Sequence, residues 1–190
     1  MHPFFKAIAL AATLASGAAF AQPVTYVLDS SHTFSRFSYT HLGLSTQSHR
    51  FDKTTGTVVF DKAAKTGSVD VVIDMTSVNT GSTVFNGHIQ NEGFFETAKF
   101  PTATFKSTKV AFDGDKPASV EGNLTINGVT KPVTLKVTNF VNMPHMMTKK
   151  EMVGADATVA IKRSEFNAGK YAPAVSDDVT ITVALEAIKQ

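Results

Sequence analysis

The chain has 190 residues and a formal net charge of +2, from 18 Lys and Arg against 16 Asp and Glu, and it contains no cysteine. A net charge this close to zero does not indicate nucleic-acid binding, and the lack of cysteine excludes a fold held by disulfide bonds. Fifteen Phe and no Trp indicate a core rich in purely apolar rings, with no indole N–H to satisfy.

The first 21 residues have the pattern of a secretory signal peptide. A single basic residue, Lys6, precedes an Ala- and Leu-rich run that ends in Ala19-Phe20-Ala21, an A-x-A cleavage site. A membrane span needs about 20 predominantly apolar residues, which this run does not supply. We therefore predict a cleaved signal peptide at 1–21, export to the periplasm without a membrane anchor, and a single mature domain at 22–190.

Most of the mature chain alternates between apolar and polar residues, as strands with one buried face do. Phe37, Tyr39 and His41 fall on one face of a strand, and Val71 and Ile73 on one face of another. The predicted strands cover residues 24–28, 32–41, 57–60, 69–75 (through Met75), 102–112, 120–126, 129–140, 152–161 and 179–187.

The stretch 82–107 interrupts this alternation and concentrates aromatic residues. Phe85 and Ile89 stand four apart and so share one face of a helix. We predict a short helical segment near residues 83–97, with a new strand after Pro101, because proline holds the preceding residue extended. If the strands form a β-barrel, this segment is expected to close one side of it.

Asn127-Gly128 predicts a hairpin with a type I′ turn, which requires positive φ at both central residues. Pro132 in the following strand indicates a sheet edge or a bulge, because proline cannot donate to the ladder. An unpaired strand edge at this position would allow a homodimer to form.

Seven to nine strands with one helical interruption predict an all-β antiparallel fold. Strands of about ten residues favour a barrel of about eight strands over a sandwich. A barrel of that size has an interior that either side chains or one small ligand can fill. The alternation alone leaves a filled barrel and a binding barrel both open.

Several motifs, in their order and spacing, resemble the YceI family of periplasmic proteins. They are YVLD at 26–29, SH at 31–32, IDMTSVNTG at 73–81, GHI at 87–89, FPTATF at 100–105, GNLTINGVTKPV at 122–133 and RSEF at 163–166. The chain departs from the family pattern at His49, where Gly is usual, at Asn86, where an acidic residue is usual, and at Asn167, where Gly is usual.

The resemblance implies a lipocalin-like barrel that carries a long-chain amphiphile, such as a polyisoprenoid lipid, an isoprenoid quinone or a fatty-acid derivative, in its tunnel. It also favours tunnel lining over core filling for the apolar candidates as a set, and it gives His32 and His88 a structural or head-group role. The candidate ligand-binding residues are Phe37, Tyr39, Val71, Ile73, Phe85, His88, Ile89, Phe94, Phe95, Leu135 and Val183.

Two other functions remain alternatives. An enzyme could act on a lipid or quinone held in the tunnel, but the chain has no cysteine and no G-x-S-x-G motif, so no catalytic residue or cofactor is predicted.

The segment 142–152 gathers four of the six Met around His145, and thioethers with an imidazole suit Cu(I). Lys149 and Lys150 oppose a cation, so we expect a loop at the barrel end and no metal site. The remaining cations, Arg163 included, are expected mostly to solvate the surface, while one or two of them could contact an anionic head group.

Overall fold

Eleven strands, one α-helix and two 3₁₀ helices make up residues 22–190, the part of the chain that the computed structural model describes. The predicted signal peptide at 1–21 lies outside these residues. In chain order the elements are β1 (Val24–Leu28), β2 (Phe34–His41), β3 (Ser45–Phe51), β4 (Thr54–Asp61), β5 (Thr66–Asp74), η1 (Met75–Ser77), β6 (Val78–Asn79), α1 (Thr83–Ile89), β7 (Thr102–Asp113), β8 (Lys116–Ile126), β9 (Val129–Pro144), β10 (Glu151–Lys162), η2 (Arg163–Phe166) and β11 (Asp178–Lys189).

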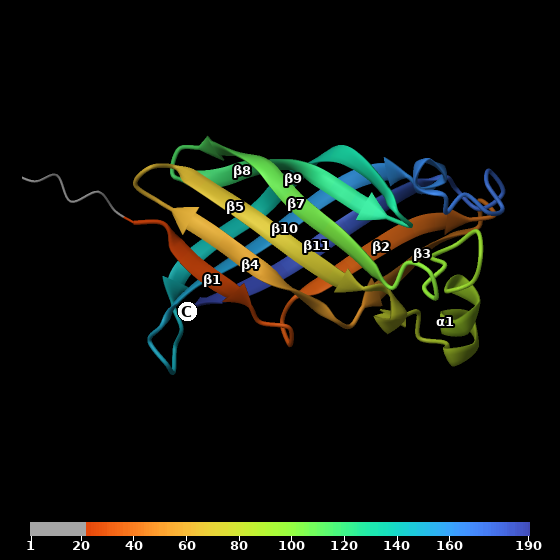
Figure 1. Cartoon of the computed structure of the whole chain (residues 1–190), viewed down its shortest axis with the longest axis horizontal. Coiled ribbons are helices and arrows are strands. Elements are labelled where there is room, and N and C mark those ends of the chain that lie inside the picture. The colour runs from red at the N-terminus through yellow and green to blue at the C-terminus, as the bar shows by residue number, and fades with distance from the viewer. Residues whose placement is uncertain (1–21) are drawn as a thin grey trace, which may run out of the picture.

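Eight strands close into an antiparallel barrel in the order β1-β4-β5-β7-β8-β9-β10-β11, because β1 pairs with both β4 and β11. Figure 1 shows the barrel from the side, with α1 at one end and the β9–β10 hairpin at the other. Its longest strand, β9, has 16 residues, which at about 3.3 Å per residue spans roughly 53 Å. The predicted all-β barrel of about eight strands is confirmed.

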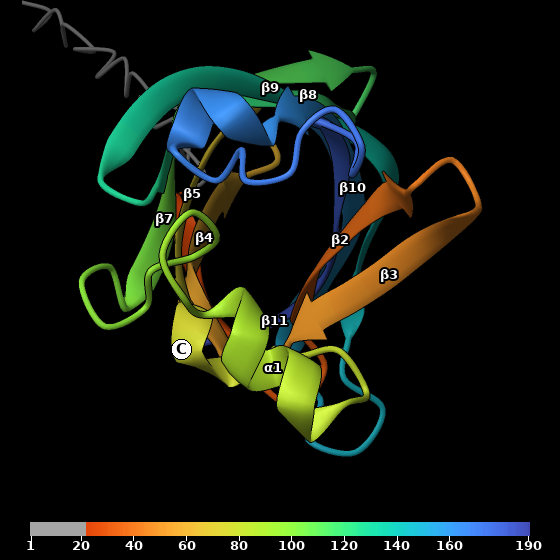
Figure 2. The same cartoon turned by 90° about the vertical axis from the view of Figure 1, so that its right-hand side faces the viewer.

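Strand β11 holds two partners along the same edge. Its C-terminal half pairs with β1, with Leu28 opposite Ala187, and its N-terminal half pairs with β2, with Phe34 opposite Ala184. Beyond β2 the sheet continues through β3 to β6. These three strands therefore extend the wall on the side of α1, as the view down the barrel in Figure 2 shows.

The sequence prediction missed β3 and β6 and placed Met75 wrongly. Most side chains of β3 are polar, so no apolar alternation marks it, and the strand forms because it pairs along β2, from Ser35–Phe51 to His41–Ser45. Met75, expected on a strand, begins η1, because the Asp74 carboxylate accepts the Thr76 N–H at 2.9 Å and ends the strand.

The Asn127-Gly128 hairpin forms as predicted, with φ of 48° and 73° at the two residues. The Asn127 side chain donates to the Phe94 carbonyl and so ties the hairpin to the segment that follows α1. The edge predicted at Pro132 is also confirmed, because the pairing of β9 with β10 ends at Lys136 opposite Thr158.

Helix α1 is shorter than the predicted helical segment at 83–97. It begins at Thr83, after the N-cap Ser82 whose hydroxyl accepts the Phe85 N–H, and it ends at Ile89. Residues 90–97 form successive turns, because Gly93 and Glu96 adopt positive φ and the Phe95 N–H donates to the Ile89 carbonyl. Among residues 22–190, no helix has the length and apolar character that crossing a membrane requires.

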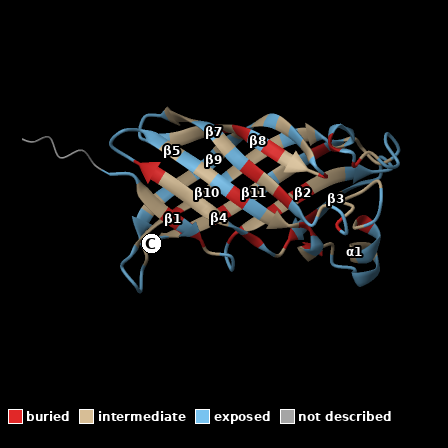
Figure 3. Ribbon diagram, viewed as in Figure 1, coloured by how far each residue is buried: buried red, intermediate tan, exposed pale blue. Residues whose placement is uncertain are grey.

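Buried and exposed residues alternate along the barrel strands, as Figure 3 shows. On β9 the pattern is regular, with half-buried Val133, Leu135 and Val137 separated by exposed residues. This period of two puts one row of apolar side chains from each strand into the barrel interior.

Candidate ligand cavity

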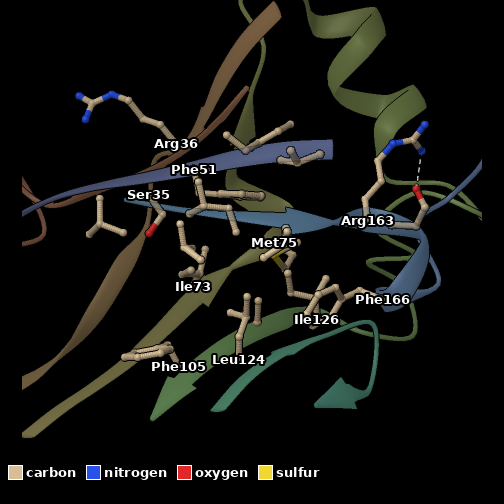
Figure 4. Close-up of a pocket in the computed structure, with 18 of the residues that line it drawn as sticks. Ser35, Arg36, Phe51, Ile73, Met75, Phe105, Leu124, Ile126, Arg163 and Phe166 are labelled. Atoms are coloured by element: carbon tan, nitrogen blue, oxygen red, sulfur yellow. Dashed lines mark hydrogen bonds between the residues drawn. The ribbon is translucent and has the colours of Figure 1, made fainter. Parts of the chain in front are cut away.

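The barrel contains an apolar cavity of about 340 Å³ that extends to the end at α1. Strands β5 and β7 to β11 line it with their inward-facing rows, and Figure 4 shows Ile73, Phe105 and Leu124 converging on it from three of these strands. Ala155 and Ala157 on β10 also face it. Because these alanines project little, that wall leaves space where larger side chains would fill the interior.

All eleven candidate residues from the sequence line this cavity: Phe37, Tyr39, Val71, Ile73, Phe85, His88, Ile89, Phe94, Phe95, Leu135 and Val183. The period of two brings the strand residues together, Phe85 and Ile89 share a face of α1, and the turns after α1 add Phe94 and Phe95. That a ligand contacts them stays a prediction.

Aromatic rings surround the end of the cavity at α1. The His88 ring lies 4.9 Å from that of Phe94, which in turn lies 5.8 Å from Tyr171. Figure 2 shows α1 on one side of this opening and the loop that follows η2 across from it. The mouth is thus framed by α1 with the turns that follow it and by the sequence-distant loop after η2, and ring contacts join the two.

Arg163 lies at the cavity and holds the loop that follows η2, so it is not one of the cations that only solvate the surface. Its guanidinium donates to the carbonyls of Lys170, Val175 and Ser176, each at 2.8 Å, and to that of Ala168. Burial lowers the pKa of Arg163, yet a guanidinium stays charged in proteins. The RSEF motif supplies this residue, but the four carbonyls are specified only by the fold.

His49 stands behind the aromatic wall, although the resemblance led us to expect Gly there. Its side chain is buried, its Nε2 lies 3.3 Å from the Tyr39 hydroxyl, and its ring contacts Phe37 and Phe85. Nδ1 has no hydrogen-bond partner among the described residues. Burial lowers the pKa of His49, so the neutral imidazole is favoured.

The other histidine of the family motifs, His32, lies away from the cavity. Its Nδ1 lies 2.8 Å from the Asp29 carboxylate, which also accepts the Ser31 N–H and hydroxyl. These bonds hold the turn between β1 and β2. Of the two histidines with a predicted structural or head-group role, only His88 faces the cavity.

The Met-rich segment forms the β9–β10 hairpin at the far end of the barrel from α1 (Figure 1). Met146 and Met147 are 80% and 84% exposed, and His145 Nδ1 lies 3.2 Å from the N–H groups of Met147 and Thr148. Across residues 22–190, no three His, Asp or Glu side chains gather in an arrangement able to hold a metal ion.

A closed antiparallel barrel with an apolar cavity opening beside a short helix defines a lipocalin-like β-barrel. The YceI-like domain model matches residues 26–187, and the chain accordingly belongs to the YceI family.

Similar proteins cover nearly the whole chain. Protein YceI of Escherichia coli O6:H1 is 35% identical over 176 residues, which is 92% of this chain and 91% of that protein. The crystal structure of BcnA from Burkholderia cenocepacia superposes with a TM-score of 0.73 at 28% identity, over 84% of this chain and 99% of BcnA. A polyisoprenoid binding domain from Saccharophagus degradans has a TM-score of 0.65 at 23% identity, over 88% of this chain and 99% of that domain, which shows a shared fold.

Proposed function

We propose that this protein binds one long-chain amphiphile in the barrel cavity and carries or stores it in the periplasm. The observation that carries the proposal is the lining of the cavity, which is almost wholly hydrocarbon along strands β5 and β7 to β11. Its volume of about 340 Å³ falls in the range of about 300 to 1,000 Å³ that small-molecule pockets occupy.

The energy of burying a hydrocarbon tail is sufficient for binding. A tail of about sixteen carbons, at roughly 0.8 kcal/mol per buried CH₂, represents about 12 kcal/mol of gross transfer free energy. Micromolar affinity needs only about 8 kcal/mol, which leaves a margin for the entropy lost when the chain is ordered. A polyisoprenoid, an isoprenoid quinone or a fatty-acid derivative has the required apolar length.

The polar groups at the cavity support binding over catalysis. Arg163 directs its hydrogen bonds to carbonyls of its own loop, and Ser164 donates its hydroxyl to Asp177 at 2.7 Å, which caps the same turn. Both side chains therefore hold the mouth in shape. The enzyme alternative would require turnover of the bound lipid by the purified protein.

Periplasmic export rests on the signal-peptide pattern of residues 1–21. A carrier outside the cytoplasm would keep a water-insoluble tail from contact with solvent as it moves. The edge of β9 at Pro132, which β10 leaves unpaired, would also allow a homodimer to form.

The proposal is tested by purifying the exported, mature protein without detergent, extracting it with organic solvent and identifying the extract by mass spectrometry. We expect one long-chain amphiphile per protein molecule. An extract without a long-chain compound, together with no uptake of cis-parinaric acid by the same protein, would contradict the proposal.

A further inference from the structure

Three phenylalanine rings meet across the barrel interior. Phe60 on β4 contacts Phe140 on β9 with ring centres 5.3 Å apart, and it stacks on Phe112 of β7 at 6.2 Å. In the closed order of eight strands, β5, β7 and β8 separate β4 from β9 on one side, and β10, β11 and β1 separate them on the other. Phe60 and Phe140 therefore project from opposite walls, and their contact closes the interior at that level.

The rings lie directly beyond the last residues that line the cavity. On β9 the lining row ends at Val137, and after the register shift the next inward residue is Phe140, paired with the cavity-lining Ala155. On β11 the lining row ends at Leu185 and is followed by Ala187, which is fully buried. Phe60 belongs to the same buried cluster as Leu185. The rings therefore lie immediately behind the last lining residues, at the end of the cavity away from α1.

A polar pocket lies on the other side of the rings. Phe60 lines it together with Tyr26, Asp61, Asn142 and Glu151. Burial and the neighbouring Glu151 carboxylate raise the pKa of Tyr26 to about 12, which keeps its hydroxyl neutral. A hydrocarbon chain that passed the rings would meet carboxylates and amides, so further methylene groups would gain no apolar contact.

We propose that Phe60, Phe112 and Phe140 form a floor that sets the longest hydrocarbon chain the cavity accepts. The proposal rests on the proposed function, since it specifies how that cavity selects among amphiphiles. Up to the floor, each added methylene should strengthen binding about fourfold, the factor that corresponds to burying one CH₂. Beyond the floor, the added carbons must fold back or stay at the mouth, and affinity stops rising.

The test measures displacement of cis-parinaric acid by saturated fatty acids of increasing length, from ten to about twenty-two carbons, on the delipidated protein. The break in the affinity series is the chain length beyond which affinity stops rising. Phe140→Ala deepens the cavity, so its break should move to longer chains by roughly two to three methylene groups, whose burial matches that of one Phe side chain. Ala155→Phe fills the space above the floor, and its break should move to shorter chains.

Phe140→Leu gives a milder deletion in case Phe140→Ala does not fold, and it should move the break in the same direction by a smaller amount. Phe34→Leu is the matched control, because Phe34 is outside the cavity lining and its ring faces the guanidinium groups of Arg36 and Arg50. Its break should equal that of the wild-type protein.

The outcomes separate the floor from the proposed function. A wild-type protein that binds no chain contradicts the proposed function itself. A wild-type protein that binds with a clear break, while Phe140→Leu and Ala155→Phe leave that break where it was, contradicts the floor alone. Opposite shifts in the deepening and filling variants support it.

Discussion

The ring of Phe37 on β2 meets the ring of Phe95 edge to face, with centres 5.5 Å apart and planes at 87°. Phe95 also contacts Phe51 on β3 at 5.5 Å, and its N–H donates to the Ile89 carbonyl. Aromatic pairs of this geometry are stabilising beyond the area they bury. The segment after α1 is therefore fixed to the β2–β3 wall and forms part of the cavity mouth.

Two neighbouring residues of α1 test whether this mouth contacts the ligand. Phe85 lines the cavity, whereas Val84 is 85% exposed. Phe85→Asp places a carboxylate against the apolar chain, so affinity for a long-chain fatty acid should fall at least about tenfold. Val84→Asp introduces the same charge one residue away and should leave affinity within about twofold of wild type. Equal affinities of the two variants, measured on folded protein, would count against lining by Phe85.

The turn at Asn127-Gly128 should be sensitive to any added side chain. Gly128 has φ of 73°, and a Cβ there would lie 2.8 Å from Phe100 Cε1. Gly114 also has positive φ, but nothing lies within 4 Å of its Cβ position. Gly114→Ala should lower the free energy of unfolding by about 1 to 2 kcal/mol, and Gly128→Ala by more, because Phe100 must also move. Urea denaturation gives both values. Equal losses of unfolding free energy would show that the Phe100 ring moves aside without destabilising the protein.

Stability should depend on pH through His49. Because burial lowers its pKa in the folded state, the unfolded chain binds more protons below the ordinary value near 6.5. The contribution of neutral His49 is therefore full above that pH and is lost progressively as the pH falls from there through the lower pKa of the folded state. Denaturant unfolding between pH 7.5 and about 5 should show a steeper loss of stability for wild type than for His49→Phe. Parallel curves would mean that His49 titrates alike in both states.

The β9–β10 hairpin should bind Cu(I) no more tightly than micromolar. His145 Nδ1 is engaged with two backbone N–H groups, and Lys149 and Lys150 repel a cation. Competition with a chromogenic Cu(I) chelator measures the affinity. Binding tighter than micromolar that disappears in a Met146→Ala/Met147→Ala variant would revive the copper alternative.

Local pattern was enough to predict the cavity walls. The alternation in β5 and β11 placed Val71, Ile73 and Val183 on the inner face, because a strand's side-chain period does not depend on which strand it pairs with. The type I′ turn at Asn127-Gly128 was likewise predictable, since its two positive φ values follow from local sterics.

Features that depend on closure of the barrel were not predictable. Strand β3 forms through pairing with β2, and its polar sequence carries no period of its own. The role of Arg163 could not be predicted because its carbonyl partners come from a loop whose path only the fold sets. The contact between Phe60 and Phe140 joins opposite walls, and nothing in either strand indicates the other.

The central claim, that the cavity holds one apolar chain, is tested most directly by calorimetric titration of the delipidated protein with a long-chain fatty acid at several temperatures. We expect saturation at one ligand per protein and a negative heat-capacity change, the signature of apolar surface leaving water. Saturation at several ligands per protein, or binding with no change in heat capacity, would place the lipid on the outer surface and contradict the account.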